Sequence, residues 1–498
     1  MYVQMISGLL LLSATISMAA TPKSLEGSRP NIILVVTDDN SFDTVGRYGG
    51  GAVSPNLDKL YDEGLRLNRF HVSPTCSPSR TAMFTGRHEF YAGVTHTIFG
   101  RDRLNPECRT IPEVLRDAGY RTGMFGKWHL GNEKKYRPYQ RGFDEAWQHG
   151  GGGIGQSYAN CSDFPANTYH NPMLLHNEEI VQEEGYCTDI FFDKAMQWIK
   201  NVKGRKPFFA YITTNTSHGP HIPPLGYDKR FPGADAYTLM QANIDDNMGR
   251  LVAFLEKQNL RENTLLIFHT DNGRGGQEVH GIKLKAGKGR AREGGVWVPC
   301  IVSWPGTLGN NEDRGQLCGH IDWYMTFSDL AGAKEKAPGT KAWDGRSLLP
   351  LFYNTAPADW DNRLFLAHRA RWKNGKREAA KYEECSIQNG SYKLFNNEIL
   401  FDMQSDRGEN TDIAAQHPEV VSNLRKQFDA FWADSVPYMI NDVNPLENGL
   451  LEDEEFHKLY KVKFGEKAYQ ERLAMMKGWG KGGQTDADFE AWKSAQKN

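Results

Sequence analysis

Two pairs of oxygen-bearing side chains in this sequence each follow a short apolar run: Asp38 with Asp39, and Asp271 with Asn272. Carboxylate and amide oxygens without imidazole or thiolate beside them suit calcium or magnesium rather than zinc. A single acidic pair after a strand is about as often a solvated turn or a helix cap. Because a second pair follows another run, we interpret the four residues as ligands of one divalent cation.

A cysteine and an arginine lie close together in the segment 76–80, which reads C-S-P-S-R, and a T-G-R triplet follows at 85–87. The alternative interpretation of Cys76 is a buried cysteine in a proline turn. Arg80, Lys127 and Lys288, each taken alone, are more often solvated surface charges. Only the motifs that contain these residues favour a functional interpretation.

Two histidines next to predicted strand ends are candidates for proton transfer. His129 lies in a Lys-Trp-His triplet, and His218 follows the apolar run 208–212. Imidazole suits this role because its ordinary pKa lies near neutrality. A lone histidine is more often structural or exposed, but two histidines at strand ends favour function. His221 stays open as an alternative to His218.

Together, these segments resemble the sulfatase family. The C-x-P-x-R core with its downstream T-G-R matches the family's first signature, and residues 120–131 (Y-R-T-G-M-F-G-K-W-H-L-G) match its second. Three further triplets resemble a block of metal and sulfate ligands: D-N-G at 271–273, G-K-G at 287–289 and E-G-G at 293–295. The resemblance covers most of the chain and leaves out only its C-terminal tail.

The resemblance implies a nucleophile and a metal. In this family a maturation enzyme oxidises the signature cysteine to formylglycine, whose aldehyde hydrates to a geminal diol. The diol attacks sulfur and contacts one calcium ion. The metal ligands implied for this chain are Asp38, Asp39, Cys76, Asp271 and Asn272.

The resemblance also implies roles for the charged residues. Arg80 steadies the modified residue, and Lys127 and Lys288 contact the sulfate or the diol. His129 removes the second proton of the diol, which ejects sulfate. His218 contacts the sulfate beside the leaving oxygen and is the candidate general acid. Such a set fits the chemistry, because sulfate-ester hydrolysis needs a strong nucleophile, neutralised sulfuryl oxygens and a proton for the leaving oxygen.

The distribution of apolar residues predicts the fold that positions this site. Nearly continuous apolar runs at 31–36, 208–212 and 265–268 predict strands covered on both faces. Helical patterns lie between them, including 112–118 and 239–257. The alternation predicts an α/β fold with a large, mixed, mostly parallel sheet flanked by helices, which the resemblance implies is alkaline phosphatase-like. Ligands bind beyond the carboxyl ends of such strands, where the polar clusters fall.

We expect a catalytic α/β domain at 29–360 and a smaller C-terminal α+β subdomain, a sheet plus a helix, at 361–444. The elements predicted for the subdomain are strands at 364–367, 392–395 and 399–403 and a helix at 418–433. The tail at 445–498 is highly charged, and its pattern predicts a helix at 452–476. The sequence of the tail indicates no function.

The first 19 residues are typical of a secretory signal peptide, with an apolar centre and small residues before a cleavage site. They lack Lys and Arg, and a buried N-terminal helix is the alternative. No later segment reaches about 18 apolar residues, so we expect no membrane span and a secreted or periplasmic protein. Lys plus Arg number 59 against 61 acidic residues, a net charge of −2, which gives no argument for nucleic-acid binding.

Seven cysteines occur without a C-x-x-C pair, which argues against a structural zinc site. If Cys76 is consumed by chemistry, the other six suffice for up to three disulfides in an oxidising compartment. We expect Cys161 to pair with Cys187.

Export and the resemblance together favour a sulfated carbohydrate as the substrate and a formylglycine-generating maturation enzyme as a partner. The glycine run at 149–153 and the segment 95–103 are candidates for sugar contacts. A glycine run is more often only a flexible loop.

Three other functions stay open. One is an arylsulfatase that acts on small aryl sulfates. Another is a phosphatase or phosphonate hydrolase on the same scaffold, although a two-zinc phosphatase needs histidine ligands and a Ser or Thr nucleophile. The third is a glycan-binding pseudoenzyme, which would lack one of the catalytic positions, whereas this chain has all of them.

Overall fold

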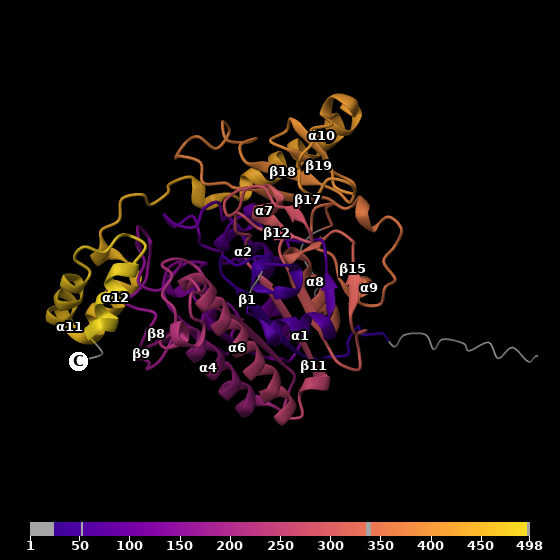
Figure 1. The fold of residues 1–498 in the computed structure, drawn as a ribbon. Helices are drawn as coiled ribbons and strands as arrows, with labels where there is room; N and C mark the ends of the chain where they lie inside the picture. The colour runs from indigo at the N-terminus through magenta and orange to yellow at the C-terminus, as the bar shows by residue number, and fades with distance from the viewer. Residues whose placement is uncertain (1–23, 51–52, 335–339, 496–498) are drawn as a thin grey trace, which may run out of the picture.

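A computed structural model describes residues 24–50, 53–334 and 340–495, so the predicted signal peptide at 1–19 lies outside the described residues. The chain folds around a ten-stranded mixed sheet with the order β15-β2-β14-β11-β1-β10-β4-β5-β8-β9 (Figure 1). In that order the strands are Glu312–Arg314, Leu65–Leu67, Cys300–Ser303, Thr264–Thr270, Asn31–Thr37, Phe208–Thr213, Arg121–Gly126, Glu145–Gln148, Met173–His176 and Glu179–Gln182.

The strands at the centre of the sheet, β11, β1, β10, β4 and β5, run parallel to one another. Antiparallel pairing begins on either side, where β14 joins β11 and β8 joins β5. The prediction of a mixed, mostly parallel sheet in an α/β fold is therefore confirmed. Because the central strands are parallel, their carboxyl ends lie at one edge of the sheet.

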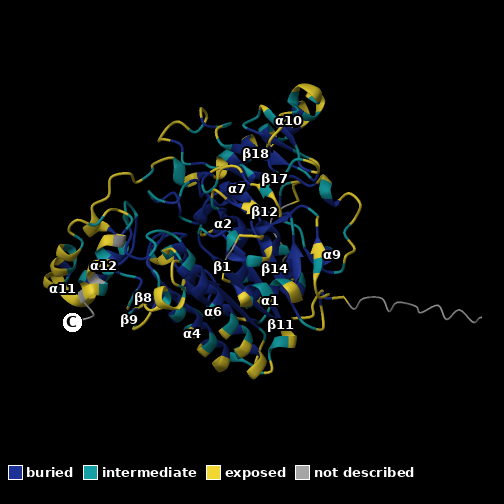
Figure 2. Ribbon diagram, in the orientation of Figure 1, coloured by how far each residue is buried: buried dark blue, intermediate teal, exposed yellow. Residues whose placement is uncertain are grey.

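The central strand β1 is buried on both faces, as its apolar run predicts (Figure 2). Ile33 and Val35 pack into one core with α1, α4 and α6, whereas Ile32 and Leu34 pack into another with α2, α3 and α8. The six helices are α1 (Pro55–Glu63), α2 (Cys76–Thr85), α3 (Ile111–Asp117), α4 (Cys187–Val202), α6 (Ala236–Lys257) and α8 (Trp323–Ala331). Across the described residues, no helix has the length and apolar character that crossing a bilayer requires.

A second, four-stranded antiparallel sheet follows, covered by helix α10. Its elements are β17 (Phe365–His368), β18 (Cys385–Gln388), β19 (Tyr392–Phe395), β20 (Ile399–Asp402) and α10 (Pro418–Ser435). Strand β18 escaped prediction because its sequence, C-S-I-Q, buries polar residues beside a single isoleucine. The apolar core of this unit includes Phe90 and Tyr91, so the second sheet packs against the segment that follows α2.

A buried ionic network joins the second sheet to the first part of the chain. Lys393 Nζ, on β19, lies 2.7 Å from Glu293 Oε1 and 3.0 Å from Glu409 Oε1. Glu293 belongs to the short helix α7 (Glu293–Val296), and its Oε2 lies 3.1 Å from His71 Nε2. All four side chains are buried, so each charge depends on its partners.

The C-terminal tail forms two helices, α11 (Glu455–Met475) and α12 (Asp486–Ala495), which lie beside β8 and β9 (Figure 1). Phe456 and Tyr460 pack with Phe164 and Met173. Farther along, Lys481 O accepts a hydrogen bond from the backbone N–H of residue 157 at 3.0 Å. The tail is therefore packed against the segment around residues 157–182. The bounds of α11 agree with the predicted helix, but Gly465, with a φ of 84°, interrupts the helix with a kink.

The predicted disulfide between Cys161 and Cys187 is wrong, because all seven cysteines are free thiols. Cys161 lies in β7 (Cys161–Ser162), where its Sγ donates to Thr97 O at 3.5 Å. Cys187 begins α4 and packs in the core beneath the sheet with residues such as Phe191. The two cysteines thus belong to different layers, which a count of cysteines does not reveal.

The ionic network leads to a stability prediction. Replacing Lys393 with Met leaves two buried carboxylates, Glu293 and Glu409, without their cation. We expect the free energy of unfolding to fall by about 3–5 kcal/mol, measured by denaturant titration. The control is Lys426→Met at an exposed position of α10, for which we expect a change below about 0.5 kcal/mol. Equal losses in the two variants would contradict a structural role for the network.

Candidate active site

Neighbouring parallel strands bring the predicted site residues to one edge of the sheet. Asp271 and Asn272 follow β11, Asp38 and Asp39 follow β1, His218 follows β10, and Lys127 and His129 follow β4. Cys76 is the first residue of α2, and Lys288 lies in the loop before α7. Residues that are far apart in the sequence therefore meet because the strands are parallel.

Asp38, Asp271 and Asn272 form a cluster of buried oxygen atoms. Each side chain is at most 1% exposed, and the Oδ1 atom of each lacks a hydrogen-bond partner among the described residues. Asn272 Nδ2 donates to Asp39 Oδ1 at 2.9 Å, so its oxygen is the atom left over. An unsatisfied buried acceptor costs about 1–3 kcal/mol. One divalent cation with a preference for oxygen ligands fits all three atoms.

Cys76 lies against this oxygen cluster. One potential ligand atom each of Asp38, Cys76 and Asp271 lies within 4.8 Å of the other two. As the first residue of α2, Cys76 lies where the helix dipole favours negative charge. Burial raises the pKa of its thiol, but Lys127 and Lys288 lower the pKa further, and the net shift is downward. The surroundings of position 76 therefore favour an anionic side chain.

Each carboxylate of the site is paired with one cation. The pairs are Arg80 Nη2 with Asp271 Oδ2 at 2.8 Å, Lys288 Nζ with Asp39 Oδ2 at 2.8 Å, and Lys127 Nζ with Asp38 Oδ2. Asp39 differs from the other predicted ligands because donors reach both of its oxygens. Burial raises the pKa of Asp39, but Lys288 and His218 lower it well below its usual range. Asp39 is therefore ionised at any working pH.

His129 reaches the site through a tight turn after β4. Gly126 has a φ of 122°, and a Cβ at this position would lie 1.7 Å from Thr213 O, so only glycine fits. His129 Nε2 lies 2.8 Å from Thr97 O, and because a carbonyl only accepts, this nitrogen carries the proton. The other nitrogen, Nδ1, is buried without a partner among the described residues. Burial and Lys127 hold the pKa of His129 well below its usual value, so the ring is neutral in the free protein.

Buried groups surround the ring of His129. A Cβ on Gly152 would lie 2.5 Å from His129 Cε1, so this glycine allows close packing on the ring. Potential ligand atoms of Asp102 and Cys161 lie within 4.8 Å of one on His129. Burial raises the pKa of Asp102 to about 8. Its carboxyl is therefore mainly neutral at pH 7 and does not make His129 a stronger base.

His218 and His221 face different cavities. His218 lines the cavity that contains Cys76, and its Nε2 lies 3.7 Å from Asp39 Oδ2. His221 lines a smaller cavity of about 100 Å³ with Tyr237. Burial and Lys288 lower the pKa of His218 to about 4. Because His218 Nδ1 donates to Gly219 O at 2.6 Å, Nε2 carries no proton in the neutral ring.

The cavity beside Cys76 has a volume of about 220 Å³. Besides Cys76, His129, His218 and Lys288, its lining consists of His96, Thr97, Ile98, Gln156, Tyr158 and Arg371. Arg371 comes from the loop after β17 in the second sheet, and sequence reasoning missed it. It lies in a charged stretch, R-A-R-W-K-N-G-K-R, that reads as ordinary surface. Gln156 and Tyr158 were missed as well, because they lie just beyond the predicted glycine run.

Some predicted residues lie away from the cavity. Within the predicted segment 95–103, Arg101 pairs with Asp442 at 2.9 Å and Arg103 pairs with Glu133. Only residues 96–98 of that segment line the cavity. The E-G-G triplet at 293–295 does not supply a cation ligand, because Glu293 belongs to the buried network with Lys393. Its glycines instead let the loop after β11 approach closely, with Gly273 N donating to Gly295 O at 3.0 Å.

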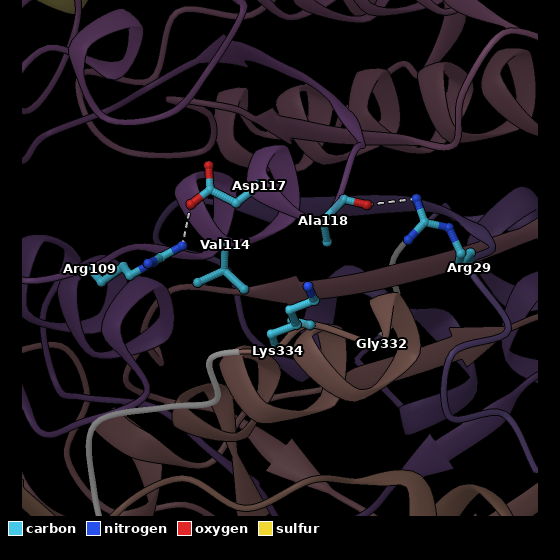
Figure 3. A pocket seen from close by; sticks show the side chains of 8 residues that line it. Arg29, Arg109, Val114, Asp117, Ala118, Gly332 and Lys334 are labelled. Atoms are coloured by element: carbon cyan, nitrogen blue, oxygen red, sulfur yellow. Dashed lines mark hydrogen bonds and ion pairs between the residues drawn. The ribbon is translucent and has the colours of Figure 1, made fainter.

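A larger cavity, of about 420 Å³, has a different character (Figure 3). Its lining includes Arg29, which precedes β1, and residues of α3. Arg109 pairs with Asp117, and Arg29 donates to Ala118 O. These groups are paired with one another and lie at the amino end of β1, so this cavity is not a candidate active site.

Family comparisons agree with the geometry. The family profile described as Sulfatase matches residues 30–333, which is more than half of the chain. A second profile, described as N-sulphoglucosamine sulphohydrolase, C-terminal, matches residues 289–433. The second match spans Glu293, Lys393 and Glu409 of the ionic network, the second sheet and most of α10.

Individual proteins are also similar to this chain. Human N-acetylgalactosamine-6-sulfatase is 30% identical over 356 residues, which cover 64% of this chain and 65% of the human protein. Mouse arylsulfatase J is 26% identical over 479 residues, which cover 84% of this chain and 79% of the mouse protein. The crystal structure of Ps i-CgsB in complex with k-i-k-neocarrahexaose is 27% identical, with a TM-score of 0.71 and coverage of 89% of this chain and 99% of that chain.

The buried oxygen cluster predicts a pH-dependent affinity for a cation. Burial raises the pKa of Asp38 to about 6, although Lys127 lowers it. Because a protonated carboxyl binds cations poorly, calcium affinity of the metal-free protein should fall below about pH 6 and level off above it. Calorimetric titration with calcium on either side of that pH measures the effect. Asp38→Asn should bind weakly at both values, and affinity that does not change with pH in the wild type would contradict the ligand assignment.

Proposed function

This chain belongs to the sulfatase family, and from that premise we propose that it hydrolyses sulfate esters of a carbohydrate through a formylglycine made from Cys76. The observation that carries the proposal is the position of Cys76. Its ligand atom lies within 4.8 Å of those of Asp38 and Asp271, beside three oxygens without partners among the described residues. That arrangement suits a nucleophile held against a cation.

Calcium is the proposed cation, with Asp38, Asp39, Asp271 and Asn272 as its protein ligands. The chemistry of the donors supports this choice, since all are carboxylate or amide oxygens. Bound there, the ion would neutralise negative charge on the sulfate and on the nucleophile. A two-zinc phosphatase would need histidine ligands, and the described oxygen cluster contains none.

Once Cys76 is converted to formylglycine, the hydrated aldehyde at this position would supply the oxygen that attacks sulfur. Lys127 and Lys288 neutralise the sulfuryl oxygens, and Arg80 holds Asp271 while donating to Lys127 O at 2.9 Å. His129 Nδ1 is free to accept a proton from position 76, because Thr97 O fixes the proton on Nε2. These groups are held in place before the substrate binds, which is how preorganised charge lowers a barrier.

His218 is the proposed general acid. We infer that the bound substrate favours the protonated form of His218 that this role requires. In the free protein, burial and Lys288 lower the pKa of His218 to about 4, so the ring is neutral. A sulfate anion that binds beside Lys288 adds negative charge, which favours the protonated imidazolium. Protonated His218 Nε2 can then donate to the leaving oxygen.

A carbohydrate substrate is favoured by the relatives and by the lining of the cavity. One relative is named N-acetylgalactosamine-6-sulfatase, and one similar structure holds a neocarrahexaose. The lining offers Thr97, Gln156 and Tyr158, whose polar groups suit sugar hydroxyls. A small aryl sulfate stays the second candidate, since arylsulfatase J is also similar to this chain.

Maturation and export complete the proposal. Cys76 is only 2% exposed, so a maturation enzyme has no access to its thiol in the folded protein. Oxidation to formylglycine therefore precedes folding of α2 onto the sheet. We expect the protein to be secreted or periplasmic, on the strength of the N-terminal signal.

Replacing the nucleophile tests the mechanism directly. Cys76→Ala should abolish release of sulfate from sulfated saccharides and from nitrophenyl sulfate, with a far-ultraviolet circular dichroism spectrum like that of the wild type. Mass spectrometry of the tryptic peptide around residue 76 should show an aldehyde in place of the thiol. An unmodified cysteine in fully active protein would contradict the formylglycine assignment.

Gly152 offers a test of His129 as the base. In Gly152→Ala the new Cβ would meet His129 Cε1 at 2.5 Å and displace the ring. Loss of a positioned base lowers kcat by about 10²-fold or more, measured by steady-state sulfate release. Gly315→Ala is the matched control, because a Cβ there meets no atom within 4 Å. Full activity of Gly152→Ala would argue against the role of His129.

A further inference from the structure

Arg371 reaches the active-site cavity from the second sheet. Its backbone N–H donates to Thr95 O at 3.0 Å, and its Nη2 donates to Thr97 Oγ1 at 3.0 Å. Ala370 and Arg371 have φ values of 53° and 63°, a left-handed backbone conformation that residues other than glycine rarely adopt. The loop is therefore held against the cavity wall in a specific shape.

Arg371 differs in its ionic partners from the other cationic side chains near Cys76. Arg80, Lys127 and Lys288 each have a carboxylate partner. Among the described residues, Arg371 has no carboxylate within ion-pair distance, and its Nε is buried without a hydrogen-bond partner. A partly buried guanidinium without a counter-charge is costly unless a ligand supplies one.

Thr97 lies between Arg371 and His129 and is hydrogen-bonded to both residues. Its carbonyl oxygen accepts from His129 Nε2 at 2.8 Å, and its hydroxyl accepts from Arg371. Under the proposed function, the ester that is cleaved lies at Cys76, beside Lys127 and Lys288. Arg371 is therefore placed to meet a different part of the same substrate.

We propose that Arg371 binds a second anionic group of the substrate, a carboxylate or a further sulfate on the saccharide. The enzyme then selects glycans that carry another negative charge close to the ester it cleaves. The planar guanidinium suits this task, because its fork of N–H donors matches both carboxylate and sulfate oxygens. This inference rests on the proposed sulfatase activity and goes beyond it by naming the class of substrate.

Kinetics with matched substrates test the inference. The substrates are a monosulfated disaccharide, the same disaccharide with a second sulfate, its counterpart with a uronic carboxylate, and nitrophenyl sulfate. Wild type should prefer at least one of the two doubly charged saccharides, and which one shows whether sulfate or carboxylate is recognised. Arg371→Met should lower kcat/KM for that saccharide on the order of 10- to 100-fold. The two substrates without a second anionic group, the monosulfated disaccharide and nitrophenyl sulfate, should change by less than about threefold.

Two further variants separate charge and shape from disturbance of the loop. Arg371→Lys keeps the charge but loses the fork, so it should recover only part of the preference. Arg369→Met is the matched control, because Arg369 lies in the same loop and is 3.8 Å from Glu383, outside the cavity lining. It should leave all four kcat/KM values close to wild type.

Several outcomes would overturn the inference. Equal losses on all substrates in Arg371→Met would make Arg371 a positioning residue for the catalytic centre, and a wild type without preference would also contradict the proposal. If no substrate were hydrolysed, the proposed function would fail, but Arg371 could still be judged by binding. In the Cys76→Ala background, calorimetry with the disulfated and the uronic disaccharides should then show that Arg371→Met weakens binding of one of them by at least about tenfold.

Discussion

The site depends on a balance of charge at a place from which water is excluded. Carboxylates that leave water at the end of a parallel sheet need partners, because an isolated buried charge is far more costly than a paired one. In this protein Arg80, Lys127 and Lys288 supply those partners, and one oxygen each of Asp38 and Asp271 stays without a donor among the described residues. A dication added to a balanced set leaves an excess of positive charge. That excess is what an anionic ester requires.

The two sheets divide the work of the enzyme. The large sheet positions the proposed nucleophile, the proposed cation ligands and both histidines, whereas the loop after β17 of the second sheet contributes Arg371 to the cavity. The buried contacts of Lys393 with Glu293 and Glu409 hold the second sheet against the part of the chain that forms the large sheet. Because α7 follows the loop that contains Lys288, the same contacts also support one wall of the site.

Sequence reasoning could predict the features that depend on local pattern. The apolar runs identify β1, β10 and β11, and because such strands are parallel, the residues that follow them had to meet. Arg371 could not be predicted in this way, since its place in the cavity depends on how the second sheet packs on Phe90 and Tyr91. Glu293 was misassigned because it adjoins the site in sequence but points toward Lys393. The predicted disulfide between Cys161 and Cys187 was wrong for a related reason, because the number of cysteines does not show which layer of the fold each one occupies.

The C-terminal tail contacts a segment that lines the cavity. Residues 156 and 158 line the cavity, and the residue between them is hydrogen-bonded to Lys481. Gly155 also lies close to Gly483, whose added Cβ would come within 3.0 Å of it. Mutations in the last fifty or so positions can therefore reshape the rim without touching any group that handles the ester. Substrate range and chemical competence can evolve separately in this protein.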